Sequence, residues 1–530
     1  MTTPNHIAIV GCGFTGTSAF FQLVDRYPVK QITIFEATGD FGPGYPYRLD
    51  ECAEYLLNNT SDTLCLVPSN LRAFVTWLKG RPDLAPGLDE KGHLPRWVYG
   101  AFLKDAFAAT CTVAAIKGIN VSLVSEEVTA LRETASGRVM LRSASGEVEA
   151  DAAILTTGRC PEFDPYPHPT AGSRARYFPT HIRTDTLDSL PLDATVHVLG
   201  ASLSAYDVIN RLFSPETGCA FERVGGVLTF RPGPNQRHVV LCSRTGRLKH
   251  AQSRYPRKLT RRHFTPAAMR AAAATDGLRL ADIAAAIQRE ADANGVAVDW
   301  PSVSEPYAGC KSGAEVNDRA GELLRHAIAE AGDPQARNFL VDLFSDARID
   351  VWDVFGERVL APDDERLYRA KLESSTLGYA APCPVSTLEK LAALHAAGRL
   401  SIVRGVREVI FDAGSDEYRI VHDFGVERAL NLVNTTSRMN RDVNSAGQPE
   451  LIRDLARQGL LHAYDRDGLA TLGATVDMKT LRAEGSQNVY LASMLLWGPG
   501  FFTSGAFIMA TVIERLLAGM FVPAEPAAGR

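Results

Sequence analysis

The stretch that decides the fold covers residues 6–37 and reads HIAIVGCGFTGTSAFFQLVDRYPVKQITIFEA. It opens with a continuous apolar run, HIAIV, which is typical of a buried strand in a parallel sheet. Three spaced glycines follow, and a second apolar run, QITIF, ends in an acid. The pattern predicts a strand, a tight turn, a helix and a second strand, which is how an α/β fold begins.

The three glycines, Gly11, Gly13 and Gly16, fit the spacing GxGxxG. In a dinucleotide site the first permits the tight turn, the second lets the backbone approach the pyrophosphate, and the third lets helix and strand pack closely. The helix N-terminus, with Thr15 in its first turn, offers N–H donors to the phosphates. Glu36 stands where a carboxylate accepts hydrogen bonds from an adenosine ribose. The stretch predicts a dinucleotide site, with a purely structural turn as the alternative.

A second, degenerate copy of the motif lies in VHVLGASLSAYDVI, where Gly200, Ser202 and Ala205 hold the three glycine positions. Ser204 lies in the first turn of the helix that follows. The next convincing strand, HVVLCSR, ends in Arg244 rather than in an acid, and an arginine there suits the 2′-phosphate of NADP. A loop lengthens the usual spacing, so a solvated surface charge stays the alternative for Arg244.

Composition narrows the class of protein. The 530 residues are too many for one hydrophobic core, so two or three domains are expected. The net charge of −5 argues against nucleic acid as a partner. The most apolar stretch, residues 489–521, is interrupted by Gly-Pro-Gly and is predicted to form a strand, a turn and a helix rather than a membrane span.

The nine cysteines show no CxxC spacing, which argues against a disulfide framework and against a zinc site. We therefore predict no metal. Scattered thiols favour a cytoplasmic protein. So does the short segment before the first strand, because its five residues leave no room for a signal peptide.

The pattern changes along the chain. Helical stretches such as ADIAAAIQREADANG and AGELLRHAIAEAG begin after about Leu248, and strands resume after about Pro382. The sequence thus predicts an α/β fold in which two Rossmann-like dinucleotide-binding domains carry a helical insertion.

Four motifs in order resemble those of flavoproteins that bind two dinucleotides: GCGFTG with Glu36, AILTTGR near Gly158, GASLSAYD near Gly200 and NLVNTTSR near Thr435. In the fourth, Ser437 stands where glycine is usual. Within this superfamily, GPGYPYRLDECAEYLLNN and the Leu-Ser-Ala-Tyr-Asp run resemble a bacterial FAD/NAD(P)-binding group. That group is related to the single-component N-hydroxylating monooxygenases of aspartate, ornithine or lysine.

The resemblance implies FAD at the first glycine motif and NADPH at the second, with NADH not excluded. It implies the first part of the FAD-binding domain over residues 1–165, the first part of the NADP-binding domain over 166–247, a helical insertion or substrate region over 248–382, and a return to both domains over 383–530. The cofactor-binding residues that it implies are Gly11, Gly13, Thr15, Gly16, Glu36, Thr157, Gly158, Gly200, Ser202, Ser204, Arg244, Trp497, Gly498, Gly500 and Phe501.

The implied activity is that of an NADPH-dependent flavin monooxygenase. Reduced FAD would take up O2 as a C4a-hydroperoxide and N-hydroxylate a small amine or amino acid, including an acidic one such as aspartate. Asn58 and Asn59 are the implied catalytic residues, because their amides could orient nicotinamide, peroxide or substrate. Thr60, with Arg254 and Arg257 from the most basic stretch of the chain, would bind substrate. Asparagines that cap their own turn, and a solvated charged face, are the alternatives.

Two other functions stay open. One is an FAD-dependent dehydrogenase or oxidase of a small metabolite that inserts no oxygen and has a vestigial second motif. The other is a flavin-binding scaffold that uses the helical insertion as an interaction surface. Dithiol reductases are set aside, because no redox cysteine pair follows the first motif. The sequence leaves open the substrate, the atom oxidised and whether the chain forms a homo-oligomer.

Overall fold

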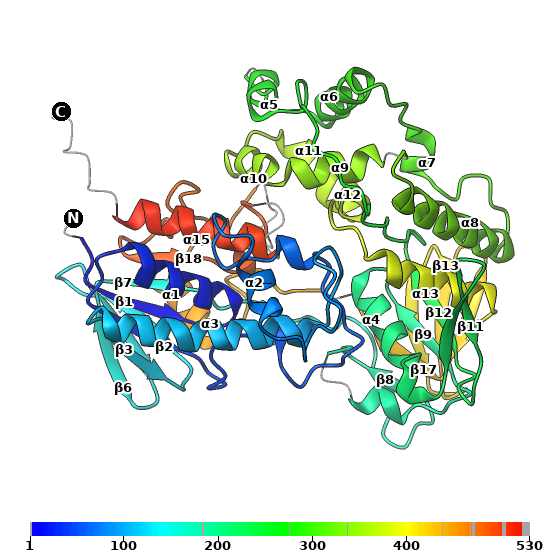
Figure 1. Cartoon of the computed structure of the whole chain (residues 1–530), viewed down its shortest axis with the longest axis horizontal. Coiled ribbons are helices and arrows are strands. Elements are labelled where there is room, and N and C mark those ends of the chain that lie inside the picture. The colour runs from blue at the N-terminus through cyan, green and yellow to red at the C-terminus, as the bar shows by residue number, and fades with distance from the viewer. Residues whose placement is uncertain are drawn as a thin grey trace.

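The structure is a computed structural model that describes residues 3–182, 185–274, 276–335, 338–436, 438–466, 468, 472–500 and 505–521. Two five-stranded parallel sheets form its framework and lie at opposite ends of the molecule (Figure 1). A group of helices lies above the region between them in this view. No helix within the described ranges is long and apolar enough to cross a membrane.

The first sheet contains, in spatial order, β18 (Val489–Leu491), β7 (Ala152–Leu155), β1 (His6–Val10), β2 (Gln31–Phe35) and β3 (Asn120–Val124). Its central strands are apolar, β-branched runs that suit a sheet covered on both faces, and β1 is buried throughout. An antiparallel meander stands before β7 and consists of β4 (Ala130–Glu133), β5 (Val139–Ser143) and β6 (Gly146–Ala150). The helices that connect these strands are α1 (Phe14–Arg26), α2 (Ala73–Lys79) and α3 (Arg96–Ile116).

The second sheet repeats this plan. Its spatial order is β13 (Leu400–Arg404), β12 (His238–Ser243), β9 (Thr195–Leu199), β17 (Asn431–Asn434) and β8 (Arg176–Phe178). Here α4 (Leu203–Leu212) follows the first strand, and the meander before β17 is β14 (Glu408–Asp412), β15 (Glu417–His422) and β16 (Gly425–Ala429). The path β1-β2-β3-meander-β7 therefore recurs as β9-β12-β13-meander-β17, which confirms the predicted pair of Rossmann-like domains.

The loop that lengthens the spacing in the second motif is an ordered excursion. It folds into a separate hairpin of β10 (Ala220–Val224) and β11 (Val227–Arg231), and the chain then enters β12. β12 pairs in parallel with β9, as β2 pairs with β1. The hairpin thus adds residues without changing the order of the sheet.

The helical region lies in the crossover from β12 to β13, the place that α2 and α3 occupy between β2 and β3. It consists of α5 (Pro266–Ala272), α6 (Leu280–Ala293), α7 (Trp300–Ser304), α8 (Gly313–Gly332), α9 (Phe339–Asp346), α10 (Arg348–Gly356), α11 (Pro362–Leu367), the π-helical turn η5 (Tyr368–Leu372), α12 (Glu373–Ala380) and α13 (Val385–Ala396). The insertion that the sequence predicts is therefore present.

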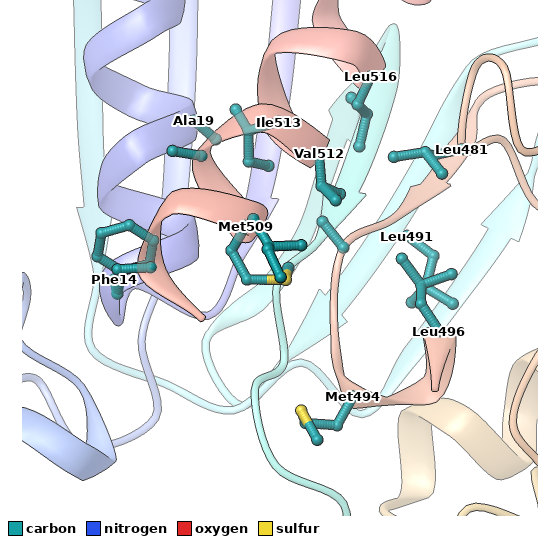
Figure 2. Packing of buried hydrophobic residues seen from close by; sticks show 14 of the residues in the cluster. Phe14, Ala19, Leu481, Leu491, Met494, Leu496, Met509, Val512, Ile513 and Leu516 are labelled. Atoms are coloured by element: carbon teal, nitrogen blue, oxygen red, sulfur yellow. The ribbon is translucent and has the colours of Figure 1, made fainter. Parts of the chain in front are cut away.

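The end of the chain returns to the first sheet through α14 (Glu450–Arg457), β18, the 3-10 turn η7 (Met494–Leu496) and α15 (Ala506–Phe521). Figure 2 shows α15 against α1, with Ile513 near Ala19 and Met509 near Phe14. Ile513 is fully buried, and burial of such a side chain contributes ~1.5–3 kcal/mol. The last helix thus packs on the first and completes the core of the first domain.

The remaining short 3-10 turns lie in loops. They are η1 (Tyr45–Tyr47), η2 (Ser61–Thr63), η3 (Asp185–Ser189) and η4 (Pro215–Thr217).

Candidate functional site

The first glycine loop joins β1 to α1 with very little free space. Gly11 has a φ of +95°, and a Cβ on it would lie 2.5 Å from the Thr156 carbonyl oxygen. A Cβ on Gly16 would lie 2.1 Å from the Gly11 carbonyl oxygen, so the helix can start this close to the strand only with glycine there. Gly13 packs against Gly44, and a Cβ on Gly44 would lie 2.5 Å from the Gly13 Cα. The loop has the compact form that a dinucleotide site requires.

The start of α1 has no side-chain cap. Gly13 is its N-cap residue, and no side chain accepts a hydrogen bond from the first turn. Thr15 is half-buried in that turn. Several other helices of the chain are capped, for example α8, where the Ser312 hydroxyl accepts from the Glu315 N–H at 3.2 Å. Other helices, such as α2, α3 and α13, are uncapped too, but at α1 the uncapped N–H groups follow the compact glycine loop, which suits an anionic ligand such as a pyrophosphate.

Glu36 lies beside the same loop. Its Oε2 accepts a hydrogen bond from the Cys12 N–H at 2.8 Å, and its Oε1 accepts from the Thr38 hydroxyl at 2.8 Å. These contacts hold the carboxylate at the end of β2, next to the glycine turn. A ribose that binds over this turn would meet the carboxylate, as the sequence predicts. Burial raises the pKa of the Cys12 thiol to about 12, so that thiol takes no part in redox chemistry at neutral pH.

The Thr-Thr-Gly turn after β7 closes on the glycine loop. The Thr156 hydroxyl donates to the carbonyl oxygens of Val10, at 3.1 Å, and Gly11. Gly158 is exposed with a φ of +69°, and its carbonyl accepts from the Met494 N–H at 3.1 Å. Thr157 is half-buried between them. The turn thus connects the glycine loop to the closing segment, and Thr156, which the sequence analysis did not select, makes the contact.

The second glycine loop repeats this geometry. Gly200 has a φ of +118°, and a Cβ on it would lie 2.5 Å from the Thr435 hydroxyl oxygen. That hydroxyl donates to the Leu199 carbonyl at 2.7 Å, as Thr156 donates to Val10. Ser437, which stands in the usual glycine position of this turn, lies outside the described residues.

The helix that follows, α4, is also uncapped. Ser202 is its N-cap residue and is exposed, yet its side chain accepts no hydrogen bond from the helix. Ser204 is half-buried in the first turn, and Ala205 is buried in the position of the third glycine. The Ala205 N–H donates to the Ser202 carbonyl at 2.8 Å, and the serine side chain, a good cap elsewhere, leaves the N–H groups of Leu203 and Ser204 open to a ligand.

The strand register locates the counterpart of Glu36. Val10 pairs with Phe35 in the first sheet, and Leu199 pairs with Cys242 in the second. The residue after Cys242 is Ser243, so this domain carries no acid at the position of Glu36. Arg244 follows, is exposed, and forms no ion pair with any described carboxylate. An arginine at this edge suits a 2′-phosphate.

Trp497, Gly498 and Gly500 form a tightly packed turn between η7 and α15. A Cβ on Gly500 would lie 2.1 Å from the Trp352 ring, and one on Gly498 would lie 2.4 Å from the Leu472 carbonyl oxygen. The indole N–H of Trp497 donates to Glu373 Oε1 at 2.9 Å. Phe501 lies outside the described residues. The turn therefore joins the helical region to the first domain.

Asn58, Asn59 and Thr60 are half-buried in a loop of the first domain. A small cavity beside Asn58 is lined by Leu56, Asn58, Leu203, Tyr206, Asp207, Asn210, Cys383, Pro384 and Thr387. Asn58 therefore lies close to the start of α4 in the second domain. The Thr60 hydroxyl donates to Asp62 at 2.6 Å, so Thr60 is engaged within its own turn.

The basic stretch after β12 is spread over the helical region rather than gathered at one site. Arg254 is exposed and lies 3.8 Å from Glu389 on α13. Arg257 donates to the Pro334 carbonyl. The ammonium of Lys249 donates to the Leu377 carbonyl at 2.7 Å, and burial lowers its pKa to about 8. The structure therefore does not bring Arg254 and Arg257 next to Asn58 or Trp497 through any described contact.

Charged residues that the sequence analysis did not select surround the turn at Trp497. Arg369 of η5 donates to Glu373 at 2.7 Å and to the Gly498 carbonyl at 2.9 Å. The Arg441 guanidinium carbon lies 4.5 Å from the centre of the Trp497 ring. These residues come from three distant parts of the chain, so no local motif could indicate them.

Known proteins resemble this chain in sequence and in fold. Residues 8–160 match the model of a family described as FAD-NAD(P)-binding. The Escherichia coli protein YdhS is 26% identical over 257 residues, which cover 46% of this chain and 46% of YdhS. The match therefore spans about half the length of this curated relative.

Two solved structures share the fold over nearly the whole chain. One is the L-lysine 6-monooxygenase of Pseudomonas syringae, with a TM-score of 0.50, 16% identity and coverage of 98% of this chain and 99% of that chain. The other is the cadaverine monooxygenase of Erwinia amylovora, solved with FAD bound, with a TM-score of 0.52, 11% identity and coverage of 100% and 98%.

The family match falls on the first glycine loop, Glu36 and the Thr-Thr-Gly turn. It confirms the predicted FAD/NAD(P)-binding resemblance, and the two solved structures agree with it at the level of the fold. Residues 8–160 thus resemble an FAD-NAD(P)-binding domain, within a chain that shares its fold with a lysine and a cadaverine monooxygenase.

Proposed function

We propose that this protein is an NADPH-dependent flavin monooxygenase that N-hydroxylates a small amine or amino acid. One observation carries the proposal: the two domains repeat the same glycine loop and uncapped helix, but only the first has an acid after its second strand. Two different dinucleotides therefore fit the chain. Its fold is also that of the lysine and cadaverine monooxygenases.

The first domain would hold FAD. The N–H groups at the start of α1 would bind the pyrophosphate, and Glu36 would accept hydrogen bonds from the ribose. Gly158, which has open space around it, would allow the backbone to approach the flavin ring, and the turn from Trp497 to Gly500 would lie beside it. When bound, FAD supplies the redox and oxygen-activating chemistry, and the protein orients the reactants and excludes water.

The second domain would hold NADPH. Gly200, Ser202 and Ser204 would bind the pyrophosphate through the start of α4, and Arg244 would bind the 2′-phosphate. Asn58 lies beside the same helix, at the border of the two domains, where its amide would orient the nicotinamide or the substrate. We propose that Asn59, in the same loop, acts with Asn58. The residues proposed to bind substrate are Thr60, Arg254 and Arg257.

The state of the cysteines supports a reducing compartment. All nine are free in the structure, and most are buried. Burial raises the pKa of Cys65 to about 12 and that of Cys160 to about 11, so these thiols stay protonated and unreactive. We infer that the protein works in the cytoplasm.

The test combines flavin content with nicotinamide kinetics. The purified protein should bind FAD and consume NADPH and O2 faster when a substrate amine is present, with a product heavier by one oxygen. Arg244→Gln should raise the KM for NADPH by about 10- to 100-fold, since it removes a charged hydrogen bond worth ~1.5–3 kcal/mol, and leave the KM for NADH unchanged.

Arg428→Gln is the matched control, because Arg428 is an exposed arginine of the same domain that pairs with Glu417 at 3.8 Å. An unchanged KM for NADPH in Arg244→Gln would favour a dehydrogenase or oxidase with a vestigial second motif. Failure of the protein to bind FAD would contradict the proposal as a whole.

A further inference from the structure

A cluster of buried and half-buried charges lies where the helical region, the returning linker and the turn at Trp497 meet. It contains Arg369, Arg441 and Arg466 together with Glu365 and Glu373, and we call it the arginine cluster. Arg369 lies in η5, a π-helical turn, and such turns are frequent at functional sites. Three arginines and two glutamates leave the cluster with one excess positive charge.

Two of the arginines have carboxylate partners. Arg369 is only 7% exposed and lies 2.7 Å from Glu373 and 3.6 Å from Glu365. Arg466 lies 3.2 Å from Glu365. These contacts, with the hydrogen bond from Arg369 to the Gly498 carbonyl, hold the helical region on the turn.

Arg441 is the arginine without an acid. No carboxylate in the described part of the chain lies within ion-pair distance of it, and its Nε is buried without a hydrogen-bond acceptor. Burial lowers the pKa of its guanidinium, and the nearby Glu373 carboxylate, beyond ion-pair distance, acts in the opposite direction. Arg441 is half-buried, and a cation that is partly removed from water is stabilised by an anionic partner. Here the protein supplies the aromatic face of Trp497 instead.

The returning linker determines where Arg441 lies. The Asn440 N–H donates to the Pro161 carbonyl at 2.7 Å, and the Phe163 N–H donates to the Arg438 carbonyl at 2.7 Å. The linker therefore runs beside the outgoing chain, a few residues after Gly158. Arg441 thus lies between the Thr-Thr-Gly turn and Trp497, on the side of the first domain where we place the flavin.

The face of the guanidinium lies over the Trp497 ring, and no described residue accepts a hydrogen bond from its edge. The edge of an arginine presents paired N–H donors that match a carboxylate. We propose that Arg441, held by Trp497 and flanked by Arg369, binds a carboxylate of the substrate. The substrate of the proposed N-hydroxylation is then an acidic compound rather than a simple amine. This inference rests on the proposed function.

A phosphate of NADPH is the other anion that could reach this arginine, and binding measurements separate the two. Succinate is the probe, and the neutral compound succinamide is its matched ligand. The FAD-loaded protein is titrated with each, without NADPH, by calorimetry and tryptophan fluorescence. Succinate should bind and succinamide should not.

Arg441→Gln should weaken succinate binding by about tenfold or more, and Arg441→Lys should restore part of it, because a single charge remains without the fork. FAD content and the KM for NADPH should stay unchanged in both. Arg457→Gln, a variant of an exposed arginine on α14, should bind succinate normally.

Equal binding of succinate by Arg441→Gln and by the unaltered protein would overturn the proposal, as would no binding by the unaltered protein. A loss of NADPH affinity instead of succinate affinity would show that the anion is a cofactor phosphate, which also overturns it.

A stability measurement separates binding from a structural role. Because Arg441 forms no ion pair with a described carboxylate, Arg441→Gln should lower the Tm only slightly. Arg369→Gln should lower it, because it leaves Glu365 and Glu373 in a buried site. A lowered Tm with unchanged succinate affinity in Arg441→Gln would show a structural arginine. Succinate binding needs no turnover, so it is tested even if the NADPH oxidation assay fails.

Discussion

At the scale of single residues, burial sets the ionisation of several groups around the helical region. His250 stacks on Tyr379 with ring centres 3.9 Å apart. Burial, together with Arg247 and Lys249, lowers the pKa of His250 to about 4 from its ordinary value of 6.5. The ring therefore stays neutral in the folded protein at pH values where the unfolded chain is protonated.

The pH dependence of stability follows from this shift. Between pH 6.5 and about 4 the unfolded chain binds a proton that the folded chain excludes, so the free energy of unfolding falls as the pH drops through this window. The loss from this one group amounts to up to about 3 kcal/mol. His250→Phe keeps the ring stack and removes the titration. Urea unfolding across this pH window should therefore show a smaller loss for the variant than for the unaltered protein, and identical slopes would contradict the assignment.

Some site residues could be predicted from the sequence and others could not. Gly11, Gly13, Gly16 and Glu36 were predictable, because the motif states their roles at fixed spacing. Arg441 was not, because its role depends on the indole of Trp497, which lies far away in sequence. An isolated arginine in a sequence carries no such information.

At the scale of elements, the turn between β1 and α1 is the most constrained part of the first domain. Gly11 combines a φ of +95° with a carbonyl at clash distance, whereas Gly118 has a positive φ of +69° and open space around it. Alanine substitutions at the two positions therefore separate the stability cost of a positive φ from the stability cost of a steric clash.

Gly118→Ala should cost ~1 kcal/mol of stability, from the positive φ alone. Gly11→Ala should cost more than that, and it should also lower FAD content, because the turn must open to admit a Cβ. Thermal unfolding and flavin absorbance measure the two effects. Equal stability of the two variants, with full FAD content in both, would show that the turn tolerates the methyl group.

The two Thr-Thr turns were predictable from the sequence, but the spacing to Arg244 was not. The sequences AILTTG and NLVNTTS indicated related turns, and the structure places Thr156 and Thr435 in the same role on the two glycine loops. The hairpin of β10 and β11 obscured the spacing to Arg244, because a sequence does not show which residues leave the sheet and return to it.

At the scale of the whole molecule, a buried ion pair joins the two domains. Arg96 at the start of α3 lies 2.8 Å from Asp207 on α4, with side-chain exposures of 17% and 7%. Arg96 also donates to the Leu56 carbonyl at 3.1 Å. The pair lies beside the cavity at Asn58, so it fixes the border where the two proposed cofactors would meet.

Arg96→Met should cost about 3 kcal/mol, because it removes the guanidinium from the buried Asp207 carboxylate and leaves only the His181 ring, 3.7 Å away, beside it. The double variant Arg96→Met, Asp207→Leu should recover most of this loss, since two apolar side chains replace two charges. Arg72→Met is the control: it breaks a more exposed pair with Glu90 and should cost less than about 1 kcal/mol. Free energies of unfolding from denaturant titrations provide the comparison. A double variant as unstable as the single one would show that the charges themselves are not the cause.

The sequence by itself determined the α/β class, the two Rossmann-like domains, the helical insertion and the first dinucleotide loop. These follow from short-range patterns: apolar runs, glycine spacing and helical periodicity. Only the tertiary structure decided which residues meet at the borders of the domains. It set the register that places Ser243 and Arg244 directly after the pairing of Cys242 with Leu199, the ion pair of Arg96 and Asp207, and the arginine cluster at Trp497. The physical reason is that burial and charge pairing depend on residues far apart in the chain, which no local pattern brings together.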